Sequence, residues 1–292
     1  MTIDVIIAEH SGFCFGVKRA VELAMTNPKT GVGNVYTWGK LIHNDHVVED
    51  LRKKNIRPID IKEIEVIGEE DTVIIRSHGI GPDTYDKIKK TGASLIDATC
   101  PFVTNVQKKA KKYYDLGYQI ILVGDASHPE VSGVNAWCQY TAIITKDGSD
   151  LTTLPKKVCV LSQTTQKLSN FEKTVEAASK LSPEVLSFNT ICSATKERQK
   201  SAEELSKNVD AMIVIGGKQS SNSLKLYEIC SRNCKNTVFI GDCTEIPKTM
   251  FFDSKIKRIG ITAGASTPDW IIADVMEQVK MMVQRFWQEK KW

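Results

Sequence analysis

Ser11-Gly12-Phe13-Cys14-Phe15-Gly16-Val17 places a thiol between a predicted strand over residues 4–8 and a predicted helix over residues 17–25. The same order of strand, polar turn, cysteine and helix returns in Asp97-Ala98-Thr99-Cys100-Pro101 and in Asn189-Thr190-Ile191-Cys192-Ser193. The three cysteines lie 86 and 92 residues apart. Because this period is too long for a solenoid unit, it predicts three small domains that resemble one another.

Short β-branched runs alternate with polar, helix-periodic stretches along the chain. The segments typical of strands are residues 4–8, 35–37, 72–76, 119–123, 158–161, 211–215, 238–240 and 258–261. The segments typical of helices are residues 17–25, 83–90, 103–116, 168–180, 196–207, 223–230 and 269–288. Strands that alternate with helices favour parallel sheets covered by helices. The expected fold class is therefore α/β, with parallel-type sheets in three similar domains.

Domain boundaries are expected just before the second and third of these cysteines. This places the repeats at residues 1–97, 98–189 and 190–270, and a closing helix over 271–292 is expected to pack back on the first repeat. Ligands of parallel α/β sheets bind beyond the carboxyl ends of the strands. Polar motifs follow three predicted strands at these ends, which makes them the candidate site.

Composition restricts the class of protein. The 292 residues are 41% hydrophobic and 25% charged, as in a soluble globular protein, and no apolar run approaches a membrane span. The start resembles a strand and lacks the pattern of a signal peptide, so a cytoplasmic location is expected. Cytosolic thiols stay reduced, which favours metal binding, catalysis or burial for the eight cysteines. The net charge of +4 suits an anionic small molecule better than nucleic acid or a membrane.

Cys14, Cys100 and Cys192 are candidate metal ligands, because a helix N-terminus stabilises the thiolate that binds a metal. Plain burial is the alternative for each one. Structural zinc usually has four ligands, often with a Cys-x-x-Cys pair, and none of these three has a cysteine close by. A 4Fe-4S cluster held by three thiolates keeps one iron open, and we favour it over zinc. Cys138, Cys159, Cys230, Cys234 and Cys243 are expected to be structural.

Hydrogen-bond donors recur about 29 positions after each cysteine and at other strand ends. The candidate anion ligands are His43, His78, His128, Ser220, Asn222 and Ser266. Such donors, together with helix N-termini, bind phosphate oxygens. The chain has neither a G-x-G-x-x-G fingerprint nor a P-loop, so bound NAD, flavin or ATP has no support and electrons should come from a separate carrier protein.

Glu130 follows His128-Pro129 at a predicted strand end. A carboxyl group in a water-poor cavity can have a raised pKa and deliver protons, although a solvated loop glutamate is the alternative. Thr164 and Thr165 could relay protons through a hydroxyl or cap the next helix, and both roles can hold.

In its ordered motifs the chain resembles the LytB family, reductases of the methylerythritol phosphate route to isoprenoids, over nearly its whole length. The motifs are Gly12-Phe13-Cys14-Phe15-Gly16-Val17, Leu41-Ile42-His43-Asn44, Arg76-Ser77-His78-Gly79, Asp97-Ala98-Thr99-Cys100-Pro101, His128-Pro129-Glu130, Gln163-Thr164-Thr165, Ser220-Ser221-Asn222-Ser223 and Gly264-Ala265-Ser266-Thr267-Pro268. The resemblance implies a trefoil of three α/β domains around a central 4Fe-4S cluster with Cys14, Cys100 and Cys192 as ligands.

The resemblance also implies the reaction. It is a reductive dehydroxylation of (E)-4-hydroxy-3-methylbut-2-enyl diphosphate to isopentenyl and dimethylallyl diphosphate, with the open iron binding the substrate hydroxyl. A ferredoxin- or flavodoxin-type protein would deliver the two electrons. Glu130 would supply protons, with Thr164 and His128 as its catalytic partners. The diphosphate would be bound by His43, His78, His128, Thr165, Ser220, Ser221, Asn222 and Ser266.

Two functions from other classes stay open. One is a zinc-dependent hydrolase or lyase of a phosphorylated substrate, which would be colourless. The other is a non-catalytic metal sensor or nucleic-acid binder that uses the mild positive charge.

Overall fold

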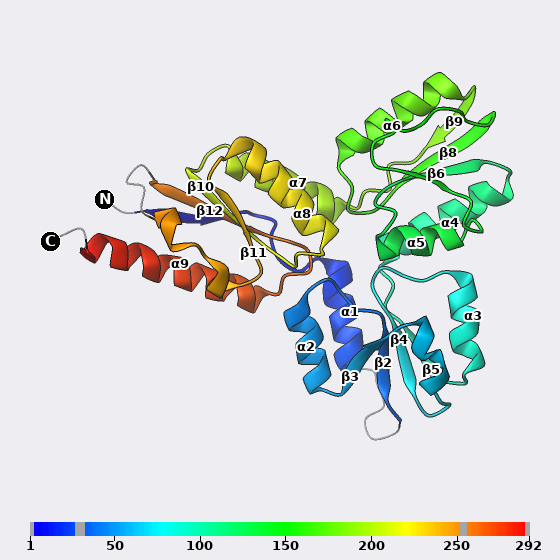
Figure 1. Ribbon diagram of the computed structural model, residues 1–292, viewed down its shortest axis with the longest axis horizontal. Helices are drawn as coiled ribbons and strands as arrows, with labels where there is room; N and C mark the ends of the chain where they lie inside the picture. The colour runs from blue at the N-terminus through cyan, green and yellow to red at the C-terminus, as the bar shows by residue number, and fades with distance from the viewer. Residues whose placement is uncertain (1–2, 27–32, 252–255, 290–292) are drawn as a thin grey trace. The chain divides into compact units, whose positions relative to one another are not determined.

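The computed structural model describes residues 3–26, 33–251 and 256–289 (Figure 1). Within these ranges the strands form three four-stranded sheets, and all the strand pairs are parallel. The predicted α/β class with parallel-type sheets is confirmed. No helix in the described residues is long and apolar enough to span a bilayer.

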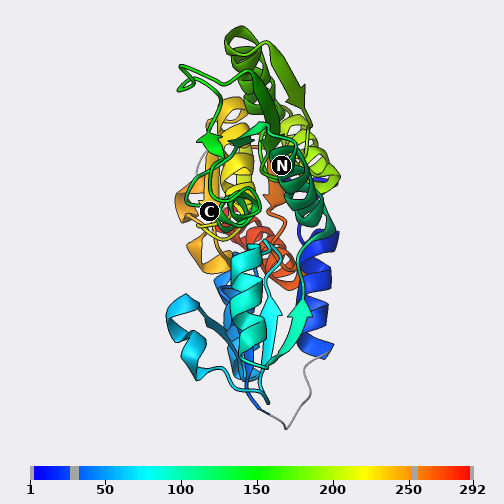
Figure 2. The ribbon, with the colours of Figure 1, turned by 90° about the vertical axis from the view of Figure 1, so that its right-hand side faces the viewer.

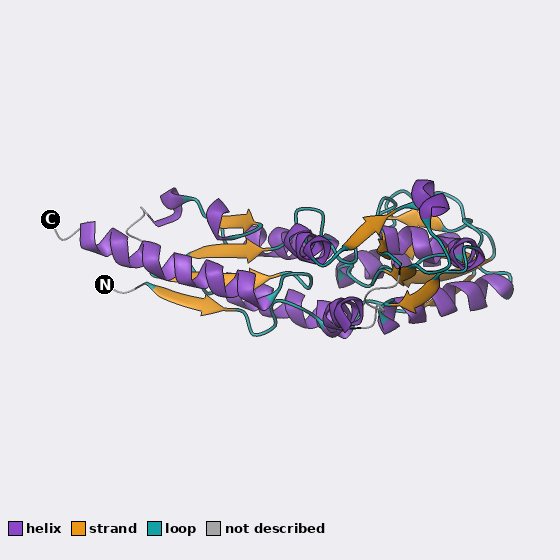
Figure 3. Cartoon of the chain, turned by 90° about the horizontal axis from the view of Figure 1, so that it is seen from below, coloured by secondary structure: helices purple, strands orange, loops and turns teal. Residues whose placement is uncertain are grey.

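Sheet A joins the first strand of the chain to strands from its last hundred residues. Its order is β1 (Asp4–Ile7), β12 (Arg258–Ala263), β10 (Ala211–Ile215) and β11 (Thr237–Ile240). Its helices are α7 (Ser193–Ser206), α8 (Ser221–Asn233) and α9 (Asp269–Glu289). Figure 3 shows the strands of this sheet pointing the same way, with α9 running alongside them.

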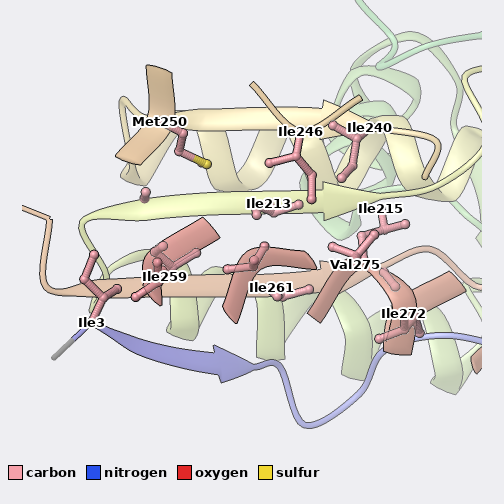
Figure 4. Packing of buried hydrophobic residues seen from close by; sticks show 14 of the residues in the cluster. Ile3, Ile213, Ile215, Ile240, Ile246, Met250, Ile259, Ile261, Ile272 and Val275 are labelled. Carbon is pink, nitrogen blue, oxygen red and sulfur yellow. The ribbon is translucent and has the colours of Figure 1, made fainter. Parts of the chain in front are cut away.

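The side chains of β10 alternate between two buried clusters, one on each face of sheet A. Ile213 and Ile215 belong to one buried cluster with Val275 of α9, part of which Figure 4 shows. Met212 and Val214 belong to a second cluster, which α7 and α8 complete. Successive side chains of a strand point to opposite faces, so a wholly apolar strand needs helices on both sides.

Sheet B has the order β3 (Ile56–Ile59), β2 (Val35–Trp38), β4 (Thr72–Ile75) and β5 (Ser94–Asp97). Its segment also holds α1 (Phe15–Thr26), α2 (Asp45–Lys53), the 3-10 helix η1 (Ile61–Val66) and α3 (Pro82–Lys90). Figures 1 and 2 show the strands lying between α1, in dark blue, and α3, in cyan.

Sheet C has the order β7 (Ile143–Thr145), β6 (Gln119–Val123), β8 (Lys157–Ser162) and β9 (Glu184–Ser187). Its helices are α4 (Pro101–Asp115), α5 (Pro129–Ala136) and α6 (Leu168–Leu181). Ile120 and Leu122 pack with α4 and α5, whereas Ile121 and Val123 pack with α6. The burial therefore alternates along β6 as it does along β10.

The chain divides into two compact units. The first unit comprises residues 1–14, 43–45 and 193–292 and contains sheet A, and the second comprises residues 15–42 and 46–192 and contains sheets B and C. The strand β1 pairs with β12, so it lies in the sheet of the last repeat and not in that of the first, where the sequence placed it. The helix α9 packs on sheet A, and residues 290–292 of the predicted closing helix lie outside the described residues.

Candidate functional site

Each of the three repeated cysteines stands at the start of a helix. Cys14 directly precedes α1, Cys100 is the N-cap of α4, and Cys192 directly precedes α7. All three are half-buried. The unbonded N–H groups in the first turn of a helix are donors that suit a negatively charged group.

The thiols of the apolar clusters have a different environment. Cys138, Cys159 and Cys230 are fully buried in hydrophobic clusters. Burial raises the pKa of Cys138 to about 11 and that of Cys159 and Cys230 to about 12. These side chains are protonated and inert at neutral pH, as the sequence predicts for them.

In the second unit, α1 packs against the turn that carries Cys100. A Cβ atom on Gly16 would lie 2.5 Å from Cys100 Sγ, so only a glycine lets this sulfur approach the start of α1 so closely. Arg19 donates from Nη1 to the Thr99 carbonyl oxygen at 3.1 Å and from Nη2 to the Asp97 carbonyl oxygen at 3.3 Å. These contacts hold the turn before Cys100 in place.

The turn after β4 joins Cys100 to two histidines. The Cys100 N–H donates to the Ser77 carbonyl oxygen at 3.0 Å, and His78 follows Ser77 in the chain. The ring centroids of His78 and His128 lie 5.2 Å apart in an edge-to-face arrangement. The ends of β4 and β6 therefore bring two of the predicted anion ligands together.

Glu130 is buried, with 1% of its surface exposed, so the solvated alternative is wrong. Its carboxylate accepts hydrogen bonds from Thr164 N at 2.6 Å and from Thr164 Oγ1 at 2.7 Å. The Glu130 N–H donates to His128 Nδ1 at 3.2 Å, and the Cys192 N–H donates to the Thr164 carbonyl oxygen at 3.1 Å. Contacts thus link Cys192, through Thr164 and Glu130, to His128.

Gln163 supports this arrangement and was not among the predicted site residues. It is 1% exposed, its Oε1 accepts from Asp125 N at 3.1 Å, and its Nε2 donates to Thr165 Oγ1 at 2.9 Å. The amide therefore fixes the half-buried Thr165 relative to the loop after β6. The only signal in the sequence is its place beside Thr164.

In the first unit, three predicted ligands start α8. Ser220 is the N-cap and accepts from Ser223 N at 3.3 Å, and Ser221 Oγ accepts from Lys225 Nζ at 2.7 Å. Asn222 is 3% exposed, and neither its amide nitrogen nor its oxygen has a hydrogen-bond partner among the described residues. A buried unpaired amide is unfavourable, so this site retains donor and acceptor capacity for a ligand.

The loop after β12 meets the segment of His43 in the same unit. Ser266 Oγ donates to the His43 carbonyl oxygen at 3.1 Å, and the Cys14 N–H donates to the Ala265 carbonyl oxygen at 3.2 Å. A Cβ atom on Gly217 would collide with the His43 carbonyl oxygen, so the loop after β10 approaches this segment closely. The first unit therefore gathers Cys14, His43 and Ser266 at the carboxyl ends of its strands.

Arg198 of α7 was also not predicted, and it holds the turn before Cys14. It is 6% exposed, and its Nε and Nη2 both donate to the Gly12 carbonyl oxygen, at 3.2 and 2.7 Å. Gly12 has a φ of 79°, and a Cβ atom there would lie 2.8 Å from Ile272 Cδ1. The turn thus depends on a glycine at this position and on the guanidinium that binds its carbonyl.

A sequence profile of the family described as LytB protein matches residues 5–280. The chain belongs to the LytB protein family. The resemblance inferred from the motifs is thereby confirmed.

Relatives in the LytB family carry one name. A protein of Clostridium acetobutylicum named 4-hydroxy-3-methylbut-2-enyl diphosphate reductase is 51% identical over 277 residues, which are 94% of this chain but 43% of that relative. A relative of the same name from Clostridium perfringens (strain 13 / Type A) is 48% identical over 280 residues, 96% of this chain and 99% of the relative. The chain therefore spans less than half the length of the first relative and nearly all of the second.

Solved structures of the LytB family have the same fold. A structure described as (E)-4-hydroxy-3-methyl-but-2-enyl diphosphate reductase, the terminal enzyme of the non-mevalonate pathway, is 41% identical with a TM-score of 0.70, covering 96% of this chain and 100% of that one. The structure of the E-1-hydroxy-2-methyl-but-2-enyl-4-diphosphate reductase from Plasmodium falciparum is 27% identical with a TM-score of 0.86, covering 96% and 88%.

The LytB family implies an iron–sulfur cluster, and the residues of this chain fit one. Three half-buried thiols stand at helix starts. Thiolates are the usual ligands of such clusters. The buried thiols in the apolar clusters lack these features.

The Arg198 contact predicts a loss of stability in this LytB chain. Arg198→Lys keeps the charge but cannot donate two hydrogen bonds in one plane to the Gly12 carbonyl, so we expect a loss of about 1.5–3 kcal/mol in the free energy of unfolding. Thermal unfolding followed by circular dichroism measures it. Arg232→Lys, at an exposed position of α8, is the control. Equal midpoints for the two variants would show that the Gly12 contact is dispensable.

Proposed function

We propose that the protein is a reductase that removes the hydroxyl group of (E)-4-hydroxy-3-methylbut-2-enyl diphosphate and forms isopentenyl and dimethylallyl diphosphate. The observation that carries the proposal is the buried Glu130–Thr164 pair, which is hydrogen-bonded to Cys192 on one side and to His128 on the other. The pair would serve as an acid next to a proposed anion ligand, His128, and to the backbone of a proposed metal ligand, Cys192. The names of the relatives from Clostridium agree with it.

The proposed cofactor is one 4Fe-4S cluster with Cys14, Cys100 and Cys192 as ligands. When bound, it would supply two electrons and an iron without a cysteine ligand for the substrate hydroxyl. The number of suitable thiols supports this choice, because three of the eight cysteines stand half-buried at helix starts while others lie in apolar clusters.

The reaction consumes two electrons and two protons, breaks the carbon–oxygen bond and releases water. One proton leaves with the hydroxyl group, and the other adds to either end of the allyl group, which accounts for two products. Thr164 Oγ1 lies 2.7 Å from Glu130 Oε2, so a protonated Glu130 would donate to this oxygen while the Thr164 hydroxyl donates to the substrate hydroxyl. We propose that Glu130 supplies the protons along this path, and that His128 orients it through the contact with Glu130 N.

The diphosphate would be bound by polar side chains. The proposed ligands are His43, His78, His128, Thr165, Ser220, Ser221, Asn222 and Ser266. The unpaired amide of Asn222 at the N-terminus of α8 supports this assignment, because amide and helix N–H groups are good donors to phosphate oxygens. Imidazole and hydroxyl groups can donate to the remaining oxygens.

Asn222→Ala should separate binding from stability. We expect the dissociation constant of the substrate to rise about tenfold, the usual value of a hydrogen bond to a charged group, while the unfolding midpoint stays equal or rises because an unpaired buried amide is removed. Calorimetric titration with the diphosphate substrate and thermal unfolding measure the two effects. Ser223→Ala, one residue further along α8, should lower the midpoint, because Ser223 Oγ donates to Ser220 Oγ at 3.0 Å. Unchanged substrate affinity in Asn222→Ala would contradict its assignment as a ligand.

A ferredoxin- or flavodoxin-type protein is the proposed electron donor. The decisive experiment for the whole proposal is anaerobic purification followed by measurement of iron, sulfide, zinc and the visible spectrum. Brown protein with about four irons, absorbance near 400 nm and turnover of the diphosphate with a chemical reductant supports the reductase. Colourless protein with stoichiometric zinc would instead support a hydrolase or lyase of a phosphorylated substrate.

A further inference from the structure

A cavity of about 300 Å³ lies at the carboxyl ends of β2, β3 and β4 in the second unit. Trp38 and Ile59 end two of these strands, Arg76 follows the third, and Lys87 lies on α3. The volume is within the range of small-molecule sites. Among the described residues that line it there is none of the proposed substrate ligands or cysteines.

Arg76 brings an unpaired cation to this cavity. Its Nε atom is buried without a hydrogen-bond partner among the described residues, and no ion pair of Arg76 occurs there. Burial lowers the pKa of Arg76 to about 10, which still leaves the group charged at neutral pH. A Cβ atom on Gly39 would lie 2.5 Å from Arg76 Nη1, and Gly39 has a φ of 69°. The backbone therefore makes room for a guanidinium group that no acidic residue neutralises.

The other charged groups at the cavity add a second unpaired cation. Lys87 lies four residues after Asp83 on α3, yet neither forms an ion pair within the described part of the chain. The carboxylates are already engaged by neutral donors: Asp83 accepts from Tyr140 Oη at 2.9 Å, and Asp60 accepts from Lys62 N at 2.8 Å. The lining therefore holds two cations and two carboxylates, of which the carboxylates have hydrogen-bond donors and the cations have no ion pair among the described residues.

The first turn of α3 adds unbonded donors at the same place. The N-cap, Gly81, provides no side-chain hydrogen bond to the helix, and Asp83 and Thr84 of the first turn line the cavity. A buried charge without a partner is unfavourable, and a bound anion removes that penalty. The N–H groups of a helix start favour the same sign of ligand.

We propose that this cavity is a second binding site, which holds the phosphate or carboxylate group of a small molecule between Arg76 and Lys87. Trp38 offers an apolar surface to the rest of the ligand. Phosphate and carboxylate groups each present two neighbouring oxygens to which a guanidinium group can donate two parallel hydrogen bonds. The site is independent of the proposed reaction, because its ligand would not contact the cysteines, Glu130 or Asn222.

Fluorescence of Trp38 tests the site directly. The anaerobically purified holoprotein is titrated with inorganic phosphate and, separately, with citrate, at an ionic strength held constant with potassium chloride. We expect a saturable change with one of these anions that Trp38→Phe abolishes. Arg76→Gln should weaken the binding by roughly ten- to hundredfold, as expected for loss of a charge-assisted hydrogen bond.

Matched variants keep the test decisive. Arg76 has no hydrogen bond to lose, so Arg76→Gln should keep the unfolding midpoint. Lys87 is exposed, so Lys87→Gln should weaken binding of the anion without affecting folding. Lys90→Gln, on the same helix, should bind the anion normally. Asn222→Ala should leave this titration unchanged, which separates the cavity from the diphosphate site. A missing saturable change with both anions, or one that Arg76→Gln and Lys87→Gln both retain, would overturn the proposal.

Discussion

Replacing Cys100 with serine should remove the proposed iron–sulfur cluster and abolish the proposed reductase activity. A neutral hydroxyl group is a far weaker ligand for iron than a thiolate, and a cluster with only three cysteine ligands should not form without one of them. We expect iron to fall from about four per chain to background, together with the brown colour and the absorbance near 400 nm. Iron and sulfide analysis of anaerobically purified protein measures this change.

Cys243→Ser is the matched control for this substitution. Cys243 is also half-buried, but it packs against the apolar cluster of sheet A and does not start an α-helix. This variant should keep its iron and its activity. If Cys100→Ser retained the full iron content, the ligand assignment would have to be abandoned, and with it the proposed three-cysteine cluster.

Glu130→Gln should lower the turnover rate by roughly 10²–10⁴-fold, the usual contribution of a positioned acid. The amide oxygen can still accept from Thr164 N, and the amide nitrogen can donate to Thr164 Oγ1, so the local conformation should be kept. The amide cannot, however, supply a proton. We therefore expect a normal iron content and substrate affinity together with slow turnover. Steady-state kinetics with a chemical reductant, combined with calorimetric titration of the substrate, distinguish rate from binding.

Asp125→Asn is the control carboxylate in the same loop. Asp125 is exposed and accepts hydrogen bonds from Ser127 N and Oγ, at 3.0 and 2.8 Å, without contacting the Glu130–Thr164 pair. Its turnover should stay within a few-fold of the unmodified protein. Normal turnover in Glu130→Gln would remove this residue from the proton path, and loss of iron in that variant would point to a structural role.

Four strands that the sequence does not predict all lie at sheet edges, and the reason is physical. They are β3, β5, β7 and β9. An edge strand has one neighbour and is less buried, so its apolar pattern is weak: both end residues of β5 are exposed, whereas all of β4 is buried. Pro58 also makes β3 hard to predict, because a proline argues against a strand and is tolerated in a sheet mainly at an edge.

Two helices were missed for different reasons. In α2, Val47, Val48 and Leu51 recur at helical spacing, so the signal is present and the prediction overlooked it. In α5, Pro129 starts the helix and Gly133 lies against the Gly79 carbonyl oxygen, so the segment has the composition of a turn. Its helical form depends on packing between sheets B and C, which local sequence does not reveal.

The sequence motifs named the residues of the candidate site but not the residues that hold them in place. The contacts among His78, His128, Glu130 and Thr164 involve residues named from sequence. Gly16 and Gln163 of the second unit and Arg198 of the first were not named as site residues, because their roles arise from contacts with other parts of the chain. Arg198, for example, lies 186 residues from the carbonyl that it binds.

The pairing of β1 with β12 sets an order for folding during synthesis. Asp4 lies opposite Arg258, so the first strand leaves the ribosome long before its partner exists. At about 5–20 residues per second this delay is roughly 10–50 seconds, during which the second unit can complete its own sheets. A pairing between segments so far apart in the sequence is slow to form. Until β12 has been synthesised, β1 has unpaired backbone N–H and C=O groups that can pair with another chain. Chaperone contact with the nascent N-terminus would therefore protect the newly made protein at its most vulnerable stage.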